Sequence, residues 1–290
     1  MNENTSTAQT TETTTVDQVK PLTLVLGASG KTGRRVAERL TAAGVAVRRG
    51  SRTASPAFDW EDPATWPAAL DGVTSVYVSF FPDLAVPGAP EAVAAFGEQA
   101  RQAGVRRLVL LSGRGEVEAQ RAEKVIAETG LEWTVVRASW FAQNFSEGAF
   151  LDSVLSGEVA LPVGDVGEPF VDAEDIADVA VAALTEDGHR GQVYEVTGPR
   201  LLTFAEAVAE IARASGREIT FAPIPLNAFT GYLAEAGEPQ EVIDMLSYLF
   251  TEVLDGRNAH IGDGVSRALG RAPRDFADYA AAAAENGAWK

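Results

Sequence analysis

The residues with the clearest chemical meaning in this sequence are three glycines spaced three apart, Gly27, Gly30 and Gly33. A short apolar run over residues 22–26 precedes them, and a stretch with the periodicity of an amphipathic helix follows. A glycine turn in this position lets the backbone approach a pyrophosphate, while the helix N-terminus supplies N–H donors and a positive dipole end. The pattern therefore predicts a nucleotide site, although the same glycines also occur in ordinary structural turns.

The choice of nucleotide depends on the segment about 20 residues beyond the turn. Sites for NAD usually place an aspartate or glutamate there, which binds the ribose 2′-hydroxyl. This chain has no acid in residues 47–52 and instead carries Arg48, Arg49 and Arg52 beside Ser51. Cations and a hydroxyl suit a 2′-phosphate, so we expect NADP(H). A solvated basic loop is the alternative.

Short apolar runs alternate with amphipathic stretches along much of the chain. Such alternation predicts a parallel sheet with helices on both faces, because each parallel connection needs a crossover helix. The expected fold class is therefore α/β, a Rossmann-type doubly wound parallel sheet with a small, mostly helical C-terminal cap. The strands are expected within residues 22–26, 45–47, 73–81, 107–111, 131–136 and 193–196.

The alternation becomes irregular near the middle of the chain, which defines the expected domains. Residues 21–138 and 170–198 form the dinucleotide-binding domain. Residues 139–169 and 199–290 form a substrate-binding cap over the carboxyl ends of the strands. Residues 1–20 are polar, rich in threonine and poor in apolar side chains, which predicts a disordered tail.

Composition argues against several classes of function. The formal net charge of −17 argues against nucleic acid and anionic membrane surfaces as partners. The chain has no cysteine and only two histidines, so we expect no metal site. It has no signal-peptide pattern and no apolar run long enough for a membrane span, which predicts a cytoplasmic protein. The expected partner is a small organic substrate, and the oligomeric state stays open.

Four segments together resemble the NmrA-like group of atypical short-chain dehydrogenases/reductases. They are the glycine motif at residues 27–33 extended by Arg34-Arg35-Val36, the run 136–145 (Val-Arg-Ala-Ser-Trp-Phe-Ala-Gln-Asn-Phe), the run 170–179, and the run 58–66. The last segment is most similar to the reductases of ergot alkaloid biosynthesis. The resemblance to that subgroup implies reduction of a cyclic iminium bond with NADPH.

The resemblance also implies which residues bind the cofactor. The pyrophosphate would lie on the glycine turn, the 2′-phosphate on the basic loop, and the two rings of the cofactor against aromatic side chains. As an alternative, Trp60, Trp140 and Phe141 are core residues, as aromatic side chains usually are. The implied set is Gly27, Ser29, Gly30, Lys31, Thr32, Gly33, Arg48, Ser51, Arg52, Asp59, Trp60, Phe80, Phe81, Ser112, Lys124, Ser139, Trp140 and Phe141.

The wider superfamily uses a Tyr-x-x-x-Lys pair as catalytic acid and cofactor clamp, and Gln120 and Lys124 occupy those positions here. Glutamine cannot donate a catalytic proton, whereas Lys124 keeps the implied contact with the nicotinamide ribose. A ketone needs a proton for its developing alkoxide, but hydride addition to an iminium or a cationic dye does not. Ser112 matches the superfamily's catalytic serine, or is a turn residue. The implied catalytic set is Lys124, Ser112 and Gln120.

The substrate pocket is expected where the cap meets the carboxyl ends of the strands. Arg114 follows a strand and is placed at the mouth of this pocket, with Trp140 and Asn144 nearby. Tyr232 and Tyr248 in the cap are candidate substitute acids, although packing is the commoner role of such tyrosines.

These observations favour an NAD(P)H-dependent oxidoreductase that transfers hydride from NADPH to an electron-poor small acceptor without a catalytic tyrosine. The acceptor would be an imine, an iminium or a quinone-like compound. A non-catalytic NADP(H)-binding redox sensor is the alternative, because the missing tyrosine fits that class too. A sugar-nucleotide epimerase is a third class, which the missing tyrosine disfavours.

Overall fold

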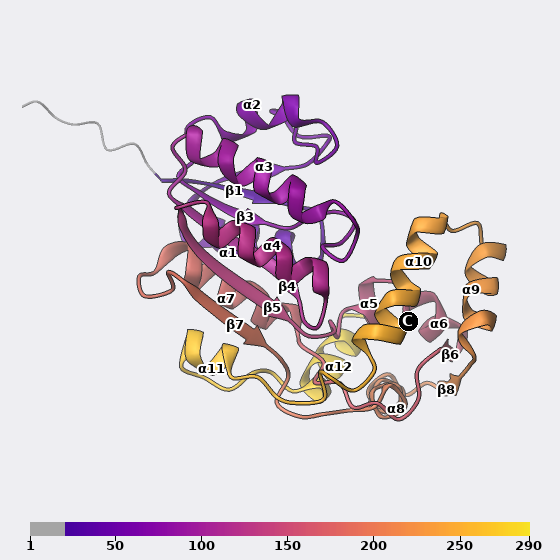
Figure 1. The fold of residues 1–290 in the computed structure, drawn as a ribbon. Helices are drawn as coiled ribbons and strands as arrows, with labels where there is room; N and C mark the ends of the chain where they lie inside the picture. Colours follow the sequence, from indigo (N-terminus) through magenta and orange to yellow (C-terminus); the bar gives the residue numbers. More distant parts are fainter. Residues whose placement is uncertain (1–20) are drawn as a thin grey trace, which may run out of the picture.

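The computed structural model describes residues 21–290, and the tail expected over residues 1–20 lies outside them. A six-stranded parallel sheet forms the centre, in the order β2-β1-β3-β4-β5-β7 (Figure 1). This confirms the expected Rossmann-type sheet, because every pair of neighbouring strands in it is parallel. Its strands are β1 (Leu22–Leu26), β2 (Ala46–Gly50), β3 (Ser75–Val78), β4 (Arg107–Gly113), β5 (Glu132–Ala138) and β7 (Gln192–Val196).

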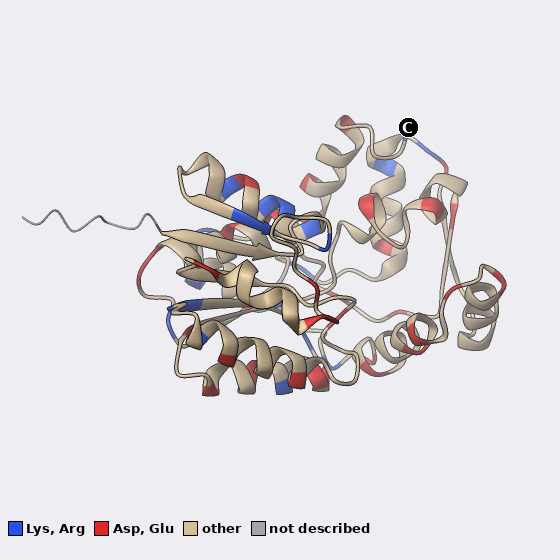
Figure 2. Cartoon of the chain, turned by 90° about the horizontal axis from the view of Figure 1, so that it is seen from above, with Lys and Arg blue, Asp and Glu red and all other residues tan. Residues whose placement is uncertain are grey.

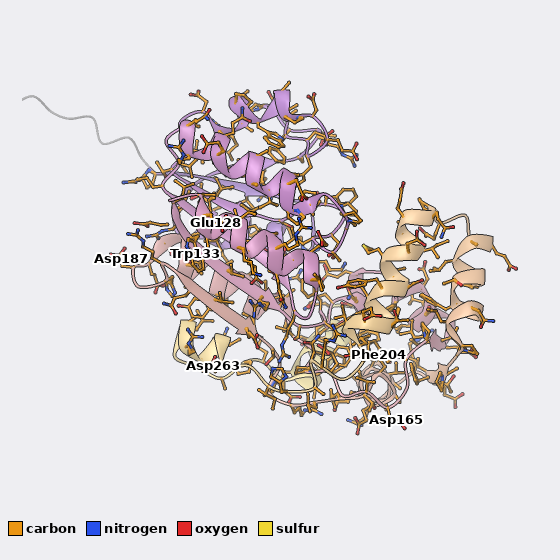
Figure 3. The ribbon with its side chains drawn as sticks, viewed as in Figure 1. Glu128, Trp133, Asp165, Asp187, Phe204 and Asp263 are labelled. Atoms are coloured by element: carbon orange, nitrogen blue, oxygen red, sulfur yellow. The ribbon has the colours of Figure 1, made fainter. Side chains whose placement is uncertain are left out.

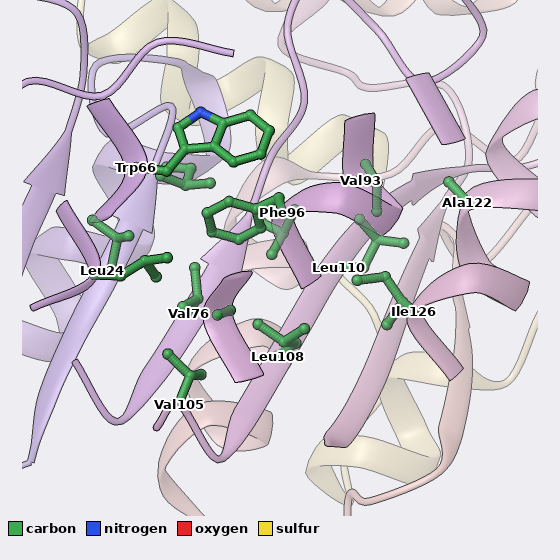
Figure 4. Packing of buried hydrophobic residues seen from close by; sticks show 14 of the residues in the cluster. Leu24, Trp66, Val76, Val93, Phe96, Val105, Leu108, Leu110, Ala122 and Ile126 are labelled. Carbon is green, nitrogen blue, oxygen red and sulfur yellow. The ribbon is translucent and has the colours of Figure 1, made fainter. Parts of the chain in front are cut away.

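Helices cover both faces of this sheet. On one face, helix side chains such as Trp66 and Phe96 pack over Val76 and Leu108 of the strands (Figure 4). Because both faces are covered, the strands are buried on each side, which explains their continuous apolar sequence runs. The first face carries α2 (Trp66–Leu70), α3 (Ala89–Gln102) and α4 (Val117–Glu128), and the second carries α1 (Lys31–Ala42) and α7 (Ala173–Thr185).

The order of the strands reverses at β1. The chain passes from β1 to β2 at the edge of the sheet and then returns to β3 on the other side of β1. The connections that leave the carboxyl ends of β1 and β3 therefore run in opposite directions and open a crevice, where doubly wound sheets bind their ligands. The glycine turn follows β1 directly and so lies at this crevice.

A second hydrophobic core belongs to the cap. It is built around aromatic side chains such as Phe145, Phe250 and Phe204, the last of which is labelled in Figure 3. The cap also contains a two-stranded parallel sheet, β6–β8, that the sequence analysis did not anticipate. The cap elements are α5 (Asn144–Glu147), α6 (Leu151–Ser156), β6 (Glu158–Leu161), α8 (Phe204–Ser215), β8 (Thr220–Pro223), α9 (Leu226–Glu235), α10 (Gln240–Tyr248), the π-helical η2 (Leu249–Val253) and α12 (Phe276–Glu285).

One segment of the expected cap belongs to the sheet instead. Helix α11 (Gly264–Leu269) packs on β7 and α7, and Val265 joins their core. Glycine permits this contact, because a Cβ on Gly264 would lie 2.4 Å from the carbonyl oxygen of Glu195 in β7. The expected cap range of 199–290 is therefore corrected at this helix.

Ion pairs join α1 to the cap and to α7. Arg35 of α1 contacts Glu147 of α5 at 2.7 Å and Glu174 of α7 at 2.5 Å. Arg39, one turn further along α1, pairs with Glu174 and Asp178. Acidic and basic residues are interspersed over the helices (Figure 2), and some of them pair where helices meet.

The described residues, 21–290, contain no helix that is long and apolar enough to cross a bilayer. They also contain no group of three or more side chains that could hold a metal ion. Buried His189 bonds to the hydroxyl of Tyr194 at 2.8 Å, whereas His260 is exposed.

The substitution Gly33→Ala tests the close approach of helix α1 to the turn after β1. A Cβ at position 33 would lie 2.2 Å from the carbonyl oxygen of Gly27, and a backbone atom cannot swing aside as a flexible side chain can. We expect the variant to lose about 3 kcal/mol or more of its free energy of unfolding, the upper end for overpacked sites. Urea denaturation measures this loss, and cofactor binding should weaken with it.

The matched control is Gly231→Ala, because no atom lies near the position of a Cβ on Gly231 in helix α9. Alanine should stabilise that exposed helix by up to about 1 kcal/mol. Equal stability of the Gly33→Ala and wild-type chains would contradict the close contact between α1 and the turn.

Candidate active site

A cavity of about 610 Å³ extends along the carboxyl ends of the strands. The turn after β1, the end of β2 and the loops after β3, β4 and β5 contribute to its wall. Leu249 and Val253 of η2 complete the wall from the cap, together with Asn144 and Glu168. The cavity therefore occupies the crevice that the reversal of strand order predicts.

The glycine turn lies in this cavity, as expected. Gly27 has a φ of +63°, which favours glycine, and its carbonyl oxygen accepts the N–H of Gly30 at 2.8 Å. Helix α1 begins at Lys31 without a side-chain cap, so its first N–H groups are available to an anion. Five residues expected to bind the pyrophosphate line the cavity: Gly27, Ser29, Gly30, Lys31 and Thr32.

Gly33 and Lys31 have different roles at this turn. Gly33 does not line the cavity, and its lack of a side chain lets α1 approach Gly27. The implied cofactor contact of Gly33 is therefore corrected to a packing role. Lys31 does line the cavity, where burial lowers the pKa of its ammonium group and Glu147 opposes that shift.

The arginines after β2 differ in what they contact. Arg52 is exposed, lines the cavity beside Ser51, and lies over the ring of Phe81 at 5.7 Å from the centroid. Within residues 21–290 it forms no salt bridge. Arg48 instead donates to the carbonyl oxygen of Asp71 at 2.7 Å, just beyond the end of α2. The expectation that Arg48 binds the cofactor is corrected, because its side chain bonds within the fold and does not line the cavity.

Aromatic side chains form much of the cavity wall. Trp60 packs against Phe80 at 4.8 Å between ring centroids and donates its indole N–H to the carbonyl oxygen of Ser79. Trp60 also joins the sheet core and Trp140 the cap core, so the core interpretation and the cavity interpretation both hold for them. The other residues expected here, Asp59, Phe80, Phe81, Ser139 and Phe141, line the cavity as well.

Both serines expected near the nicotinamide use their hydroxyl protons within the fold. Ser112 donates to Glu123 Oε1 at 2.6 Å, and Ser139 donates to the carbonyl oxygen of Pro169 at 2.6 Å. Both serines line the cavity, so each oxygen remains able to accept a hydrogen bond from a ligand. Ser112 is thus placed to orient a ligand rather than to supply a proton.

The pair that replaces Tyr-x-x-x-Lys does not reach the cavity. Gln120 and Lys124 are exposed on α4 and form no part of the cavity wall. The buried face of α4 contains Ala119 and Glu123, each one residue earlier, and Glu123 is the residue that meets Ser112. The catalytic role of Gln120 and the cofactor contact of Lys124 are therefore corrected, because a one-residue step turns a side chain away from the site.

Neither candidate tyrosine lines the cavity. Tyr232 is 69% exposed on α9, and the hydroxyl of Tyr248 accepts the backbone N–H of Val117 at 3.1 Å. In the part of the chain that the structure describes, the cavity wall contains no tyrosine at all. The role of both residues as substitute acids is therefore corrected, whereas Arg114 and Asn144 line the cavity as expected.

Two carboxyl groups of the cavity wall lie beside each other, one half-buried and one buried. Asp83 belongs to the segment after β3 and Glu116 directly precedes α4, within hydrogen-bonding reach of one another. Burial raises the pKa of both groups, and the charge of Asp83 raises the pKa of Glu116 further. Gly113 makes room for this pair, because a Cβ there would lie 1.9 Å from Glu116 Oε1.

A third carboxyl group, that of Glu168, lies between the sheet and the cap. It is only 3% exposed, and Oε1 accepts the backbone N–H of Trp140 at 3.1 Å. Burial raises the pKa of Glu168 to about 7, while that hydrogen bond and the positive charge of Arg114 oppose the shift. The sequence carried no signal for this residue, because a lone glutamate between glycine and proline is typical of an exposed loop.

A doubly wound sheet with a glycine turn at its crevice defines a dinucleotide-binding protein. The chain belongs to a family described as NAD(P)H-binding, whose profile matches residues 27–187, more than half of its length. NAD(P)H azoreductase of Xenophilus azovorans is 32% identical, over 89% of this chain and 96% of its own length. Agroclavine dehydrogenase of Claviceps fusiformis is 30% identical, over 88% and 95%. Family and relatives confirm the expected class, an NAD(P)H-dependent reductase.

Solved structures share this fold. The Citrobacter sp. triphenylmethane reductase complexed with NADP(H) has a TM-score of 0.72 at 19% identity, covering 91% of this chain and 99% of that one. NmrA, a negative transcriptional regulator in complex with NADP, has a TM-score of 0.65 at 17% identity, covering 93% and 98%. At these identities the likeness shows the fold, and it agrees with the NmrA-like resemblance of the sequence.

The substitution Lys124→Ala tests the corrected position of that lysine. A surface substitution changes free energies by about 0.5 kcal/mol or less, so the Kd for NADPH should change by about twofold at most. Isothermal calorimetry measures the Kd, and Lys31→Ala, which alters the cavity wall, is the positive control. Weakening of NADPH binding by Lys124→Ala as large as that by Lys31→Ala would restore the expected contact.

The raised pKa of Glu168 predicts a pH-dependent stability. The ordinary pKa of 4.5 applies to the unfolded chain, whereas the folded chain keeps the proton up to about pH 7. The free energy of unfolding therefore falls as pH rises through this window, because the folded chain binds more protons there. The full loss is about 3 kcal/mol, since one pKa unit corresponds to about 1.4 kcal/mol.

The substitution Glu168→Gln removes this titration. Relative to the wild type, the variant should gain up to about 3 kcal/mol of unfolding free energy between pH 5 and pH 8, measured by urea denaturation. Asp165→Asn removes an exposed carboxyl group from the same loop and should follow the wild-type curve. If the curves of Glu168→Gln and the wild type run parallel, Glu168 is ionised throughout this range.

Proposed function

We propose that this chain transfers hydride from NADPH to an electron-poor small organic acceptor without using a catalytic tyrosine. The observation that carries the proposal is the make-up of the cavity. It joins a dinucleotide turn and a basic loop to aromatic walls beneath the cap, and within residues 21–290 no tyrosine lines it. Bound at the turn, NADPH supplies a hydride ion from its nicotinamide ring.

The residues around the turn fit NADP(H). Lys31 and the N-terminus of α1 would hold the pyrophosphate, and Arg52 with Ser51 would hold the 2′-phosphate. Arg52 suits that role because it is exposed and no carboxylate within residues 21–290 neutralises it. A dinucleotide crosses the crevice of a doubly wound sheet, so its nicotinamide half would extend from β1 toward β4 and β5.

The class of acceptor is supported by the far wall of the cavity. Trp140, Phe141, Leu249 and Val253 present flat or apolar surfaces there, which suit a conjugated organic molecule. Relatives named for azo compounds and for agroclavine, and a fold neighbour named for triphenylmethane compounds, support the same choice. We therefore infer an imine, an iminium or a quinone-like acceptor.

The protein itself would contribute alignment and exclusion of water. Leu249 and Val253 cover the cavity from the cap, while Ser112 and Ser139 offer oxygen atoms that accept hydrogen bonds. Holding the acceptor against the cofactor converts an encounter of two molecules into a step within one complex.

A non-catalytic NADP(H) sensor is the second candidate. The observation that favours it is the fold shared with NmrA, together with the absence of a tyrosine from the described cavity wall. A sensor and a reductase differ in one measurable property, which is repeated oxidation of the cofactor.

Steady-state oxidation of NADPH separates these candidates. We expect turnover on the order of 1 s⁻¹ or more with at least one acceptor from a panel of cyclic iminium ions, quinones and triphenylmethane dyes. The loss of NADPH absorbance measures the rate. Oxidation that stops after one equivalent per chain, or never starts, with every acceptor would favour the sensor.

Preference for NADPH over NADH should depend on Arg52. Removal of a charge-assisted contact costs about 1–3 kcal/mol, so Arg52→Ala should weaken NADPH binding roughly 5- to 150-fold and leave NADH binding little changed. Calorimetric titration with both cofactors measures the two affinities. Arg49→Ala is the matched control, because Arg49 is exposed nearby and does not line the cavity. Equal affinity of the wild-type chain for both cofactors would refute the assignment.

A further inference from the structure

Reduction of a neutral acceptor requires a proton donor, because hydride addition leaves negative charge on the acceptor. The candidate acids expected from the sequence do not serve, since Tyr232 is exposed and Tyr248 does not line the cavity. The hydroxyl groups of Ser112 and Ser139 donate within the fold. Lys31 also lines the cavity, but it lies on the glycine turn, where we propose that the pyrophosphate binds. The other candidate donors at the wall are carboxyl groups with a raised pKa, and one of them differs from the others.

Glu168 has the position of a proton donor. It lies at the junction of sheet and cap, with 3% exposure, on the cavity wall that it shares with Trp140 and Ser139. Its Oε1 atom is fixed by the backbone N–H of Trp140 at 3.1 Å. Its Oε2 atom makes no side-chain hydrogen bond with residues 21–290, which leaves this oxygen for a ligand.

Arg114 lies near Glu168 and has unused donors. It is 4% exposed, and its Nη1 donates to the carbonyl oxygen of Asn258 at 3.0 Å. Its Nε and Nη2 atoms are buried without a hydrogen-bond acceptor among the described residues, and Glu195 Oε2 lies 3.5 Å from Nε. Buried N–H groups without acceptors are costly, and these would gain an acceptor if the Arg114 side chain turned toward a ligand oxygen in the cavity that it lines.

We propose that Glu168 is the general acid of this reductase and that Arg114 binds the acceptor oxygen on which negative charge develops. The proposal rests on the proposed function and narrows its acceptor class. An oxygen that needs both a cation and a proton belongs to a neutral conjugated carbonyl or quinone-like compound, not to a permanent iminium ion.

Electrons and protons balance in this step. The acceptor gains a C–H bond from the hydride that NADPH supplies, and the π electrons of its carbonyl group move to oxygen. Arg114 stabilises the oxyanion while Glu168 transfers its proton, so an O–H bond forms as the carboxyl O–H bond breaks. The acceptor is reduced by two electrons, NADP⁺ is the oxidised product, and the Glu168 carboxylate regains a proton from water.

The charges around Glu168 suit this role. Burial raises the pKa of Glu168 to about 7, so the group can hold a proton at neutral pH and release it readily. Arg114 is the charged group that faces Glu168, and it would stabilise the carboxylate after proton transfer. Glu195 of β7 contacts Arg114, and Arg137 and His260 contact Glu195 in turn.

Asp83 and Glu116 fit the role less well. Each faces the other, so release of their shared proton would leave two negative charges side by side. Glu123 adds a third negative charge near Glu116. Glu168 faces a cation instead, which makes its conjugate base the easier one to form.

The test uses Glu168→Gln with two acceptors, a quinone that must gain a proton and an N-alkyl iminium ion that needs none. We expect kcat for the quinone to fall on the order of a hundredfold or more, and the ratio of quinone to iminium rates to fall by the same order. The wild-type quinone rate should decrease as pH rises through about 7, and the variant should lose this limb. Arg114→Gln should lower kcat for the quinone on the order of tenfold or more, because the guanidinium stabilises negative charge that develops only during the step.

Asp165→Asn is the matched control, because Asp165 is exposed in the same loop at the outside of the cap (Figure 3). This variant should keep the wild-type ratio of quinone to iminium rates. Its quinone rate should also decrease as pH rises, as in the wild type. Glu168→Asp retains a carboxyl group and should keep a limb even where folding is weakened. Independently of activity, the infrared band of a protonated carboxyl group at pH 6 should diminish in Glu168→Gln.

The outcomes separate the two proposals. A pH limb that persists in Glu168→Gln, or an unchanged ratio of the two rates, overturns the role of Glu168. If Glu116→Gln alone loses the decrease of the quinone rate with pH, the proton donor belongs to the pair of Asp83 and Glu116. This result would also overturn the role of Glu168. Failure of the wild-type chain to reduce either acceptor overturns the proposed function, and the acid with it.

Discussion

The approach of helix α1 to the turn after β1 is the contact on which the cofactor site depends. The space between Gly33 and the Gly27 carbonyl oxygen admits no side-chain atom, since a Cβ would lie 2.2 Å from that oxygen. This contact holds the N-terminus of α1 at the point where the strand order reverses. The N–H donors of the helix and the carboxyl ends of the strands therefore face one crevice, and an anion there meets both.

The same helix also fixes the cap. Arg35 lies one turn beyond Lys31 and contacts Glu147 of α5 and Glu174 of α7. A buried ion pair adds little net stability, but removal of one partner leaves an uncompensated charge, so the geometry is strongly specified. Asp175 of α7, which is fully buried, is held in turn by arginines from the segment between α11 and α12. These ion pairs therefore fix the position of the cap, which covers the cavity, relative to the sheet and its helices.

The sheet could be predicted from the sequence because its signals are local. Apolar runs of strand length alternate with amphipathic helices, and each glycine of the turn stands where the backbone needs it. The parallel pair β6–β8 could not be predicted, because each strand has four residues and their pairing joins distant segments. Helix α11 was misassigned for a related reason: only the contact of Gly264 with β7 shows which core it joins.

The site residues also differ in this respect. Some could be placed from local sequence patterns, and others depend on contacts between distant segments. Most residues expected on the turn and on the loops after strands line the cavity, because loops at the carboxyl ends of the strands border the crevice. Lys124 was misplaced because one residue along a helix rotates a side chain by about 100°. Glu168 was missed because its burial is created by the cap, through Trp140 and the pairing of its backbone with Leu202.

In our proposal the proton comes from the segment that joins sheet and cap and not from α4. A tyrosine on α4 would sit on a helix of the rigid sheet layer, whereas Glu168 sits on the segment that bridges sheet and cap. The backbone of this segment bonds to Leu202 on the cap side and its side chain bonds to Trp140 after β5. Trp140 and Leu202 both join the cap core, so Glu168 meets Arg114, which follows β4, only when the cap is seated on the sheet. Exclusion of water and placement of the proton donor would then both depend on the contact between the cap and the sheet.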